Sequence, residues 1–430
     1  MERAILVAAP RKGSPDGRHI AEHLDELTRL VDTAGAEVVG KVSQQVVSPN
    51  PATLIGEGKV EEVRAEIEST GATLVIFDEE LSPVQGANLE RELKVRVMDR
   101  AEVILDIFST RARSHEAKLQ VELAQLEYLL PRLTRMWTHL SRIRGGIGLR
   151  GPGETQLETD RRIIRRRIQS LKEKLRDVEK HRENLRAGRD PMLSVALVGY
   201  TNAGKSSILR MLSGEHEIFV EDRLFATLDP LTREVDLGEG TRARVTDTVG
   251  FIRKLPHHLV ASFRATLEEA RDGDVLLHVV DASHHDWEGQ MRVVDKVLAE
   301  LDLADRPTIP VFNKLDAVAD PSALTARVRE LFPGGVLATT MRIDGLEALK
   351  SRLRGIERKD RVVVRVRVPA GDGATAASLY RMGEVMGRED DGATAELTVR
   401  LDAWQAERLR EQGLEVSRIG AGADERRLTG

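Results

Sequence analysis

The sequence has no cysteine, and only 3% of its 430 residues are aromatic. Without thiols the chain has neither disulfide bridges nor thiolate metal sites. So few aromatic rings also disfavour the base-stacking platforms of RNA-recognition modules. No apolar run approaches the roughly 20 residues needed to cross a bilayer, and the short run at residues 4–9 is typical of a buried strand rather than a signal peptide. We therefore expect a cytoplasmic protein without a membrane span. We also expect a monomer.

What the chain does contain is enough apolar material for folded cores and an uneven distribution of charge. Hydrophobic residues make up 41% of the sequence, which disfavours disorder, and the length predicts two to four domains at roughly 100–200 residues each. The net charge of −5 is unevenly divided, because residues 141–189 hold 15 Lys and Arg against 7 Asp and Glu. That segment carries +8 and the remainder −13. A basic block inside an acidic chain indicates a nucleic-acid partner for the block.

Residues 1–110 alternate strand-like and helical segments, a rhythm that predicts an N-terminal α/β domain with a largely parallel sheet. The expected strands are residues 4–9, 37–42, 74–77 and 95–99, and the expected helices are 19–34, 59–70 and 84–93.

Residues 111–190 predict a long antiparallel helical hairpin. From Leu119 to Leu140 and again from Leu157 to Leu185, apolar residues recur at steps of three and four, the spacing of a coiled-coil seam. Pro131 should kink the first helix. Residues 141–155 contain five glycines and one proline, which predicts a loop at the tip of the hairpin.

Residues 191–358 predict a doubly wound sheet, with strand-like runs at 193–198, 243–246, 275–280 and 308–312. Gly199, Gly250 and Asn313 stand at or just after the carboxyl ends of three runs, where such folds bind ligands. Residues 359–430 predict a small C-terminal α/β unit with a βαβαβ order. The expected fold class is therefore α/β, with the helical hairpin inserted after the first domain.

A phosphate-binding loop follows the strand at 193–198. Gly199-Tyr-Thr-Asn-Ala-Gly-Lys-Ser206 matches the pattern G-x-x-x-x-G-K-[ST] and opens a helical segment, the context that the motif requires. Glycines let backbone amides approach phosphate oxygens, Lys205 supplies charge to the β- and γ-phosphates, and Ser206 can ligate Mg²⁺. The pattern predicts a P-loop nucleotide-binding domain.

Two further elements favour GTP. Asp247-Thr-Val-Gly250 ends a second strand, where Asp247 can organise Mg²⁺ and Gly250 can sense the γ-phosphate. Asn313-Lys-Leu-Asp316 ends a third, and the Asp316 carboxylate can accept hydrogen bonds from the ring N–H and exocyclic amine of guanine. Adenine offers no such pair of donors, so the buried carboxylate would be left unpaired with ATP.

Hydrolysis should be slow without help. Thr227 lies between the first two elements, where a GTPase needs a switch threonine for Mg²⁺ and the γ-phosphate. Phe251 stands where Ras-like enzymes carry a water-orienting glutamine, so no side chain there can position the nucleophile, and we expect stimulation in trans. Asn202 either helps to bind a K⁺ ion that supplies catalytic charge or is only a residue suited to a turn.

The sequence resembles the HflX family of ribosome-associated GTPases. The resemblance covers about residues 1–350 and rests on residues 119–133, 145–162, 199–206, 225–229 and 247–251. It implies a protein that binds GTP, joins the large ribosomal subunit and splits ribosomes under stress. It also implies that the hairpin tip, with Arg142, Arg144 and Arg150, enters ribosomal RNA. Thr339-Thr340 departs from the Ser-Ala usual at the guanine loop of the family.

These arguments give a full set of expected site residues. The expected catalytic residues are Lys205, Thr227 and Gly250, and the expected metal ligands are Ser206 and Thr227. The expected nucleotide-binding residues are Gly199, Tyr200, Thr201, Asn202, Ala203, Gly204, Lys205, Ser206, Ser207, Phe225, Ala226, Thr227, Leu228, Asp229, Asp247, Thr248, Val249, Gly250, Asn313, Lys314, Asp316, Thr339, Thr340 and Met341. The expected RNA-binding residues are Arg142, Arg144, Arg150, Arg161, Arg162, Arg165 and Arg166.

The leading hypothesis is a GTPase with Mg²⁺ as cofactor, whose hydrolysis is triggered by the ribosome. One alternative is a nucleotide-gated ribosome-binding factor in which hydrolysis serves only release. Another is an ATP-driven RNA remodeller, and a second nucleotide site within residues 1–105 is also open because residues 56–59 resemble a fragment of a phosphate loop.

Overall fold

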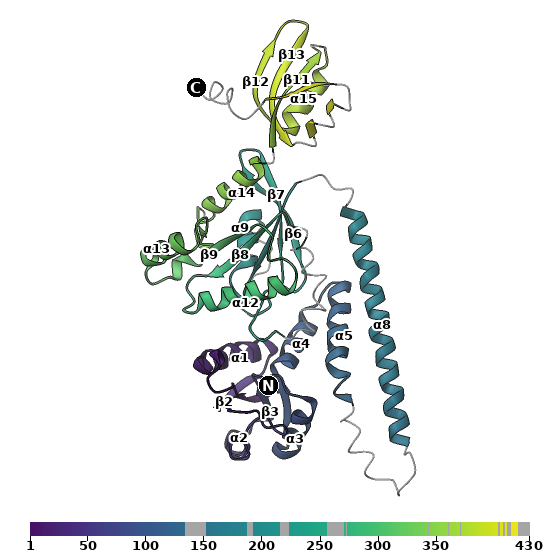
Figure 1. Ribbon diagram of the computed structural model, residues 1–430, viewed down its shortest axis with the longest axis vertical. Coiled ribbons are helices and arrows are strands. Elements are labelled where there is room, and N and C mark those ends of the chain that lie inside the picture. The colour runs from purple at the N-terminus through teal and green to yellow at the C-terminus, as the bar shows by residue number, and fades with distance from the viewer. Residues whose placement is uncertain are drawn as a thin grey trace.

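The computed structural model describes the chain except residues 134–151, 187–191, 216–222, 256–270, 272, 343, 360, 370, 403–404, 407–408, 411–413 and 420–430. The predicted tip arginines Arg142, Arg144 and Arg150 lie outside the described residues. The α/β fold class is confirmed. Figure 1 shows the C-terminal sheet at one end of the molecule, the N-terminal domain at the other and the nucleotide-binding domain between them, with two long helices along one side.

The N-terminal domain is a four-stranded parallel sheet covered by helices. The strands are β1 (Arg3–Ala8), β2 (Glu37–Ser43), β3 (Leu74–Phe77) and β4 (Arg96–Asp99), in the order β2-β1-β3-β4. The helices are α1 (Ile20–Ala34), α2 (Glu57–Thr70), α3 (Pro83–Leu93) and α4 (Arg100–Arg111), with a 3₁₀ turn at Pro15–Arg18. β1 and β3 are almost continuously buried, because helices cover both faces of the sheet.

The helical hairpin consists of α5 (His115–Leu129) and α8 (Pro152–Arg186). Leu119 and Leu123 of α5 pack against Leu171 of α8, as the seam predicts. The helices are antiparallel, because the start of α5 bonds to the nucleotide-binding domain and the end of α8 is followed within a few residues by that domain's first strand (Figure 1).

Around Pro131 the first helix is interrupted, because α5 ends at Leu129 and a turn follows, and the rest of the predicted first helix lies outside the described residues. One detail of the predicted hairpin is wrong. The predicted loop at 141–155 extends too far, since α8 begins at Pro152. Proline suits the first helical position, where its missing N–H costs no hydrogen bond.

The nucleotide-binding domain is a six-stranded sheet in the order β10-β9-β8-β5-β7-β6. The strands are β5 (Leu193–Gly199), β6 (Leu231–Gly238), β7 (Thr241–Asp247), β8 (Val275–Asp281), β9 (Thr308–Asn313) and β10 (Val336–Leu337). The described helices are α9 (Lys205–Ser213), α12 (Trp287–Glu300), α13 (Pro321–Leu331) and α14 (Glu347–Lys359), with a 3₁₀ turn at Leu315–Ala317. Only β6 is antiparallel. β5 pairs with β7 on one side and β8 on the other, so the sheet reverses its strand order there and opens a ligand crevice at the carboxyl ends.

The C-terminal unit differs from its predicted βαβαβ order. It contains β11 (Arg361–Pro369), α15 (Gly373–Met382), β12 (Glu384–Asp390), β13 (Thr394–Asp402) and β14 (Glu415–Arg418), in an antiparallel sheet ordered β12-β13-β11-β14. The additional strand is β12, an edge strand whose sequence is mostly polar. Within the described residues, no helix is long and apolar enough to cross a membrane.

His278 in the middle of β8 should make folding sensitive to acid. The side chain is buried, and this burial, with a smaller contribution from Lys205, lowers its pKa to about 4. The unfolded chain binds this proton at the ordinary pKa of 6.5, so stability is lost as the pH falls from about 6.5 to about 4, by up to about 3 kcal/mol. We expect H278Q to flatten this part of the pH profile, measured by urea unfolding at several pH values. If the free energy of unfolding fell equally with pH in wild type and H278Q, His278 would not be the source of the acid sensitivity. The difference in the free energy of unfolding at pH 8, where His278 is neutral in both states, gives the cost of the substitution itself.

Candidate nucleotide-binding site

The phosphate loop joins β5 to α9 and places a buried cation at its centre. Gly204 has φ +94°, and a Cβ on it would lie 2.2 Å from Asn313 Nδ2, so this position requires glycine. Lys205 Nζ donates to the carbonyl oxygens of Gly199 at 3.3 Å and Tyr200 at 2.9 Å. Burial lowers the pKa of Lys205 to about 8, against the opposing effect of Asp247. A phosphate group is the partner that such a desolvated ammonium needs.

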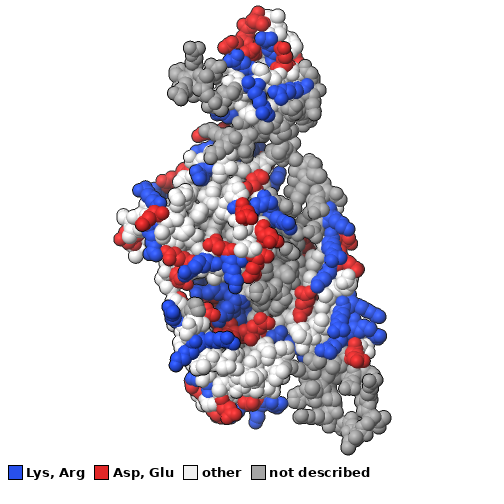
Figure 2. Space-filling model, in the orientation of Figure 1, with Lys and Arg blue, Asp and Glu red and all other residues white. Residues whose placement is uncertain are grey.

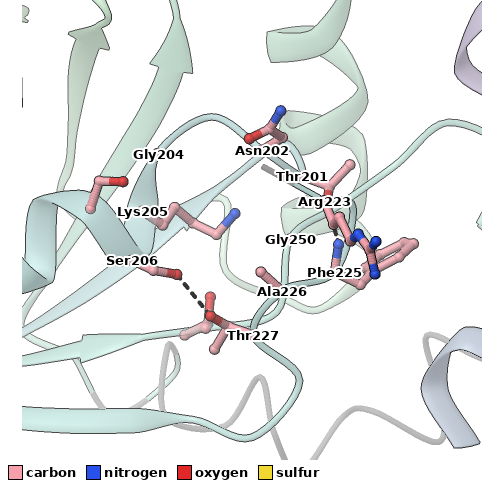
Figure 3. A pocket seen from close by; sticks show the side chains of 12 residues that line it. Thr201, Asn202, Gly204, Lys205, Ser206, Arg223, Phe225, Ala226, Thr227 and Gly250 are labelled. Carbon is pink, nitrogen blue, oxygen red and sulfur yellow. Dashed lines mark hydrogen bonds between the residues drawn. The ribbon is translucent and has the colours of Figure 1, made fainter. Parts of the chain in front are cut away.

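Three side-chain oxygens converge beside this lysine. Ser206 Oγ lies 2.7 Å from Thr227 Oγ1 (Figure 3). Both hydroxyls donate to Asp247 Oδ2, Ser206 at 2.6 Å and Thr227 at 2.9 Å. Burial raises the pKa of Asp247, and its Oδ1 has no hydrogen-bond partner among the described residues. A set of two hydroxyls and a carboxylate fits Mg²⁺, which prefers oxygen ligands and keeps several waters.

Gly250 presses the end of β7 against the phosphate loop. A Cβ on Gly250 would lie 2.6 Å from Thr201 Cα and 3.0 Å from Lys205 Nζ. Thr201 N donates to Phe251 O at 2.7 Å, and Phe251 N donates to Gly199 O at 3.0 Å, so the two segments are tied together. The Phe251 ring is buried. The geometry therefore leaves backbone N–H, rather than a side chain, to face a γ-phosphate here.

The residues expected to bind guanine lie at the ends of β9 and β10. Asn313 Nδ2 donates to Ala203 O at 3.0 Å and so links this segment to the phosphate loop. The Thr339 hydroxyl donates to Asp316 Oδ1, and Met341 N donates to Thr339 Oγ1 at 3.2 Å. Although Thr339-Thr340 departs from the Ser-Ala of the resembled family, the Thr339 hydroxyl orients the Asp316 carboxylate as a serine hydroxyl could. Lys314 Nζ pairs with Asp281 Oδ2 at 2.7 Å.

The pocket brings together most of the expected phosphate-side residues. Its walls are Thr201, Asn202, Gly204, Lys205, Ser206, Ser207, Arg223, Phe225, Ala226, Thr227, Thr248 and Gly250. Arg223 is the one that sequence analysis missed, because arginine is no part of the motifs, although its place two residues before Phe225-Ala-Thr227 was a usable signal.

Several expected nucleotide-binding residues direct their side chains elsewhere. The Tyr200 hydroxyl donates to Glu26 of α1 and accepts from Arg253 N at 2.9 Å. Asp229 accepts from Arg113 N at 2.9 Å and Ser114 N at 3.2 Å, at the start of α5. The side chains of Leu228 and Val249 are buried in the hydrophobic core. These residues join the nucleotide site to the N-terminal domain and the hairpin.

A cluster of buried charges extends this junction. Lys254, just after Phe251, pairs with Asp78 and lies 3.1 Å from Glu79. Arg100 of α4 lies 2.7 Å from Asp78 and also pairs with Glu26. Although burial alone would raise the pKa of Asp78, Arg100 and Lys254 hold it below its usual value. The segment that follows Gly250 is thus fastened to the N-terminal domain by ion pairs, which the sequence motifs do not indicate.

The expected RNA-binding residues of α8 form an exposed basic face. Arg162, Arg165 and Arg166 are exposed and Arg161 is half-buried, and Figure 2 shows Lys and Arg gathered over this helix. Arg167 on the same helix is paired with Glu122 of α5 at 2.6 Å. Arg162, Arg165 and Arg166 are therefore the predicted RNA-binding residues of α8 that are best placed to bind a phosphate backbone.

Comparison with known proteins decides the family. Family models match residues 21–109 (GTP-binding GTPase N-terminal), 111–189 (GTP-binding GTPase Middle Region) and 194–314 (50S ribosome-binding GTPase). The chain is 43% identical to the GTPase HflX of Escherichia coli over 399 residues, covering 91% of this chain and 92% of that one. The chain belongs to the GTPase HflX family. The GTPase HflX of Lacrimispora saccharolytica is 48% identical over 84% of both chains. A crystal structure of SsGBP with GDP covers 84% of this chain and 99% of that one, at 25% identity and a TM-score of 0.47.

Membership of the HflX family confirms the resemblance that the motifs indicate, and the chain is a GTPase. GTPases of this kind depend on Mg²⁺ in general, and the oxygens of Ser206, Thr227 and Asp247 fit that ion.

Proposed function

We propose that this HflX-family GTPase binds the large ribosomal subunit through ribosomal RNA and splits or rescues stalled ribosomes under stress, acting as a cytoplasmic monomer. The observation that carries the proposal is the exposed arginine face of α8, the helix that makes up most of the basic segment 141–189. Arginine side chains on a helix can bind RNA phosphates without reading a base. The description of the model matched by residues 194–314, a 50S ribosome-binding GTPase, supports this choice of partner.

The ribosome would also stimulate hydrolysis. Position 251, directly after Gly250, holds a buried phenylalanine and so offers no polar side chain to orient the attacking water. That orientation would then be supplied in trans. Ser206 and Thr227 would ligate Mg²⁺, and Asn202, which lines the pocket, is the residue that would contact a K⁺ ion. The junction of the nucleotide site with the N-terminal domain and α5 gives a route by which the bound nucleotide would affect the hairpin.

Neutralising the α8 face should weaken ribosome binding. We expect the triple change R162Q, R165Q and R166Q to lower the affinity for large subunits, measured by sedimentation with a non-hydrolysable GTP analogue, GDP or no nucleotide. Binding releases about one counterion from the RNA for each phosphate that the protein contacts. The slope of log affinity against log salt should therefore decrease in magnitude by about one for each contact that the substitutions remove. GTP turnover stimulated by large subunits should fall in parallel.

A matched control removes three exposed arginines from the nucleotide-binding domain, Arg292, Arg306 and Arg329, and should leave the salt slope unchanged. An unchanged slope in the α8 variant would contradict the proposed RNA contact. Absence of any stimulation of the wild-type protein by large subunits would contradict the trigger.

A further inference from the structure

Arg223 stands at the mouth of the phosphate pocket. It lines the pocket together with Lys205, Thr227 and Gly250, and it is exposed. Figure 3 shows its guanidinium between Phe225 and the Thr201 side of the phosphate loop, on the same cavity as the Lys205 ammonium. Lys205 and Arg223 are the two cationic side chains among the described residues that line this pocket.

The segment that carries Arg223 is anchored on both sides. Phe225 N donates to Thr201 Oγ1 at 2.9 Å, which ties the segment to the phosphate loop. The Phe225 ring packs edge-on against Phe108 of α4, with the ring centroids 4.8 Å apart. Phe225 has φ +56°, a conformation that costs energy for a bulky residue and is kept only where surrounding contacts fix it. Arg223 is therefore two residues away from Phe225, whose position beside the phosphate loop is fixed by these contacts.

Among the described residues, Arg223 has no partner that would account for its position. It makes no hydrogen bond or ion pair with them, whereas Arg233, ten residues further along, pairs with Glu215 at 2.6 Å. A guanidinium that lines a phosphate pocket and has no ion pair with the described residues can bind phosphate oxygens through two parallel N–H groups.

GTP hydrolysis requires positive charge near the phosphate oxygens on which negative charge develops. In hydrolysis a water oxygen forms a bond to the γ-phosphorus, the bond from that phosphorus to the β–γ bridging oxygen breaks, and GDP leaves with additional negative charge on its β-phosphate. Both protons of the water end on inorganic phosphate, which is released as H₂PO₄⁻. Stabilising the charge that develops on these oxygens is the main contribution an enzyme makes to phosphoryl transfer. Lys205 supplies one positive charge, and the buried Phe251 ring supplies none.

We propose that Arg223 is a catalytic residue that places its guanidinium on the γ-phosphate oxygens and the β–γ bridging oxygen, so that this chain provides the catalytic arginine from its own switch segment. Charge and water orientation are separate requirements. Arg223 meets the first, and an outside partner remains necessary for the second. Because the GTPase activity itself is a property of the family, this inference does not depend on ribosome binding.

The test is single-turnover GTP hydrolysis by the full-length protein without ribosomes, comparing wild type with R223A, R223K and the control R292A. We expect R223A to hydrolyse GTP about 10³-fold more slowly, while its affinity for a non-hydrolysable GTP analogue changes less than about threefold, by less than about 0.7 kcal/mol. R223A should also fail to retain GDP with aluminium fluoride, which mimics the transferring phosphoryl group. R223K should recover part of the rate, and R292A should match wild type.

Buffers containing K⁺ or Na⁺ provide the second arm, because a K⁺ ion near Asn202 is the competing source of charge. Equal wild-type turnover in both salts supports Arg223. The proposal is overturned if R223A hydrolyses GTP at the wild-type rate and retains GDP with aluminium fluoride. It is also overturned if R223A loses affinity for the analogue while its rate at saturating GTP is unchanged, since the arginine would then act in binding alone.

Discussion

Replacing Asp316 with Asn should lower the affinity for GTP by about 10²- to 10³-fold and shift the preference towards xanthosine triphosphate. The Asp316 carboxylate is positioned by the Thr339 hydroxyl, and it can accept hydrogen bonds from both donors on guanine. An asparagine side chain has only one oxygen, so its NH₂ group would face one of the two N–H donors of guanine and could not accept a hydrogen bond from it. Xanthine carries a carbonyl where guanine carries its amine, so it can accept from the amide. Equilibrium titration with fluorescent GTP, ATP and xanthosine triphosphate analogues measures the shift.

A control for this substitution lies four residues further on. Asp320 caps α13 by accepting from Ser322 N at 3.1 Å and Ala323 N at 3.0 Å, and asparagine serves equally well at such a cap. D320N should therefore bind GTP as wild type does. If D316N also kept full GTP affinity, the base would be recognised elsewhere in the protein and the predicted guanine motif would be wrong.

The sequence was most informative where function depends on a local pattern. Gly199, Lys205, Ser206 and the carboxylates at the strand ends are recognisable because phosphate binding requires particular residues at fixed spacing after a strand. The parallel strands of the N-terminal domain were located for a similar reason, since short apolar runs between helical segments leave few alternatives. β12 was missed because an edge strand with a largely polar sequence lacks the alternation that distinguishes strand from helix.

The contacts that join the domains could not be inferred from a pattern. The Tyr200 hydroxyl meets a carboxylate 174 positions away, and Lys254 meets one 176 positions away. Asp229 was assigned to the nucleotide, yet its carboxylate binds the start of α5. A charged residue next to a nucleotide motif has the same appearance in sequence whether it faces the ligand or a neighbouring domain. The fold decides between these, through contacts that involve no periodicity or spacing.

The buried charges at this junction lead to the largest expected effect on stability. Arg100 is only 2% exposed and bridges Asp78, itself 1% exposed, and Glu26. Removing one partner of a buried pair leaves the other charge without compensation, which costs about 3–5 kcal/mol. We expect R100A to lose stability of this order, measured by urea unfolding at neutral pH, and R100K to lose less because one ammonium can still pair with one of the two carboxylates.

The neighbouring Arg96 gives the matched control. Its side chain is 53% exposed and pairs with Glu102 at 3.0 Å, so R96A should cost less than about 1 kcal/mol. The R100A substitution should also reach the nucleotide site, because Glu26 accepts from Tyr200 of the phosphate loop and Asp78 accepts from Lys254 beside Phe251. The gain in stability on adding GTP with Mg²⁺ should therefore differ between R100A and wild type, while R96A should show the wild-type gain. If R100A unfolds like R96A and gains equally from nucleotide, the ion cluster fastens neither the two domains nor the segment of Lys254. The contact of Asp229 with the start of α5 would then be the leading candidate for coupling the nucleotide to the hairpin.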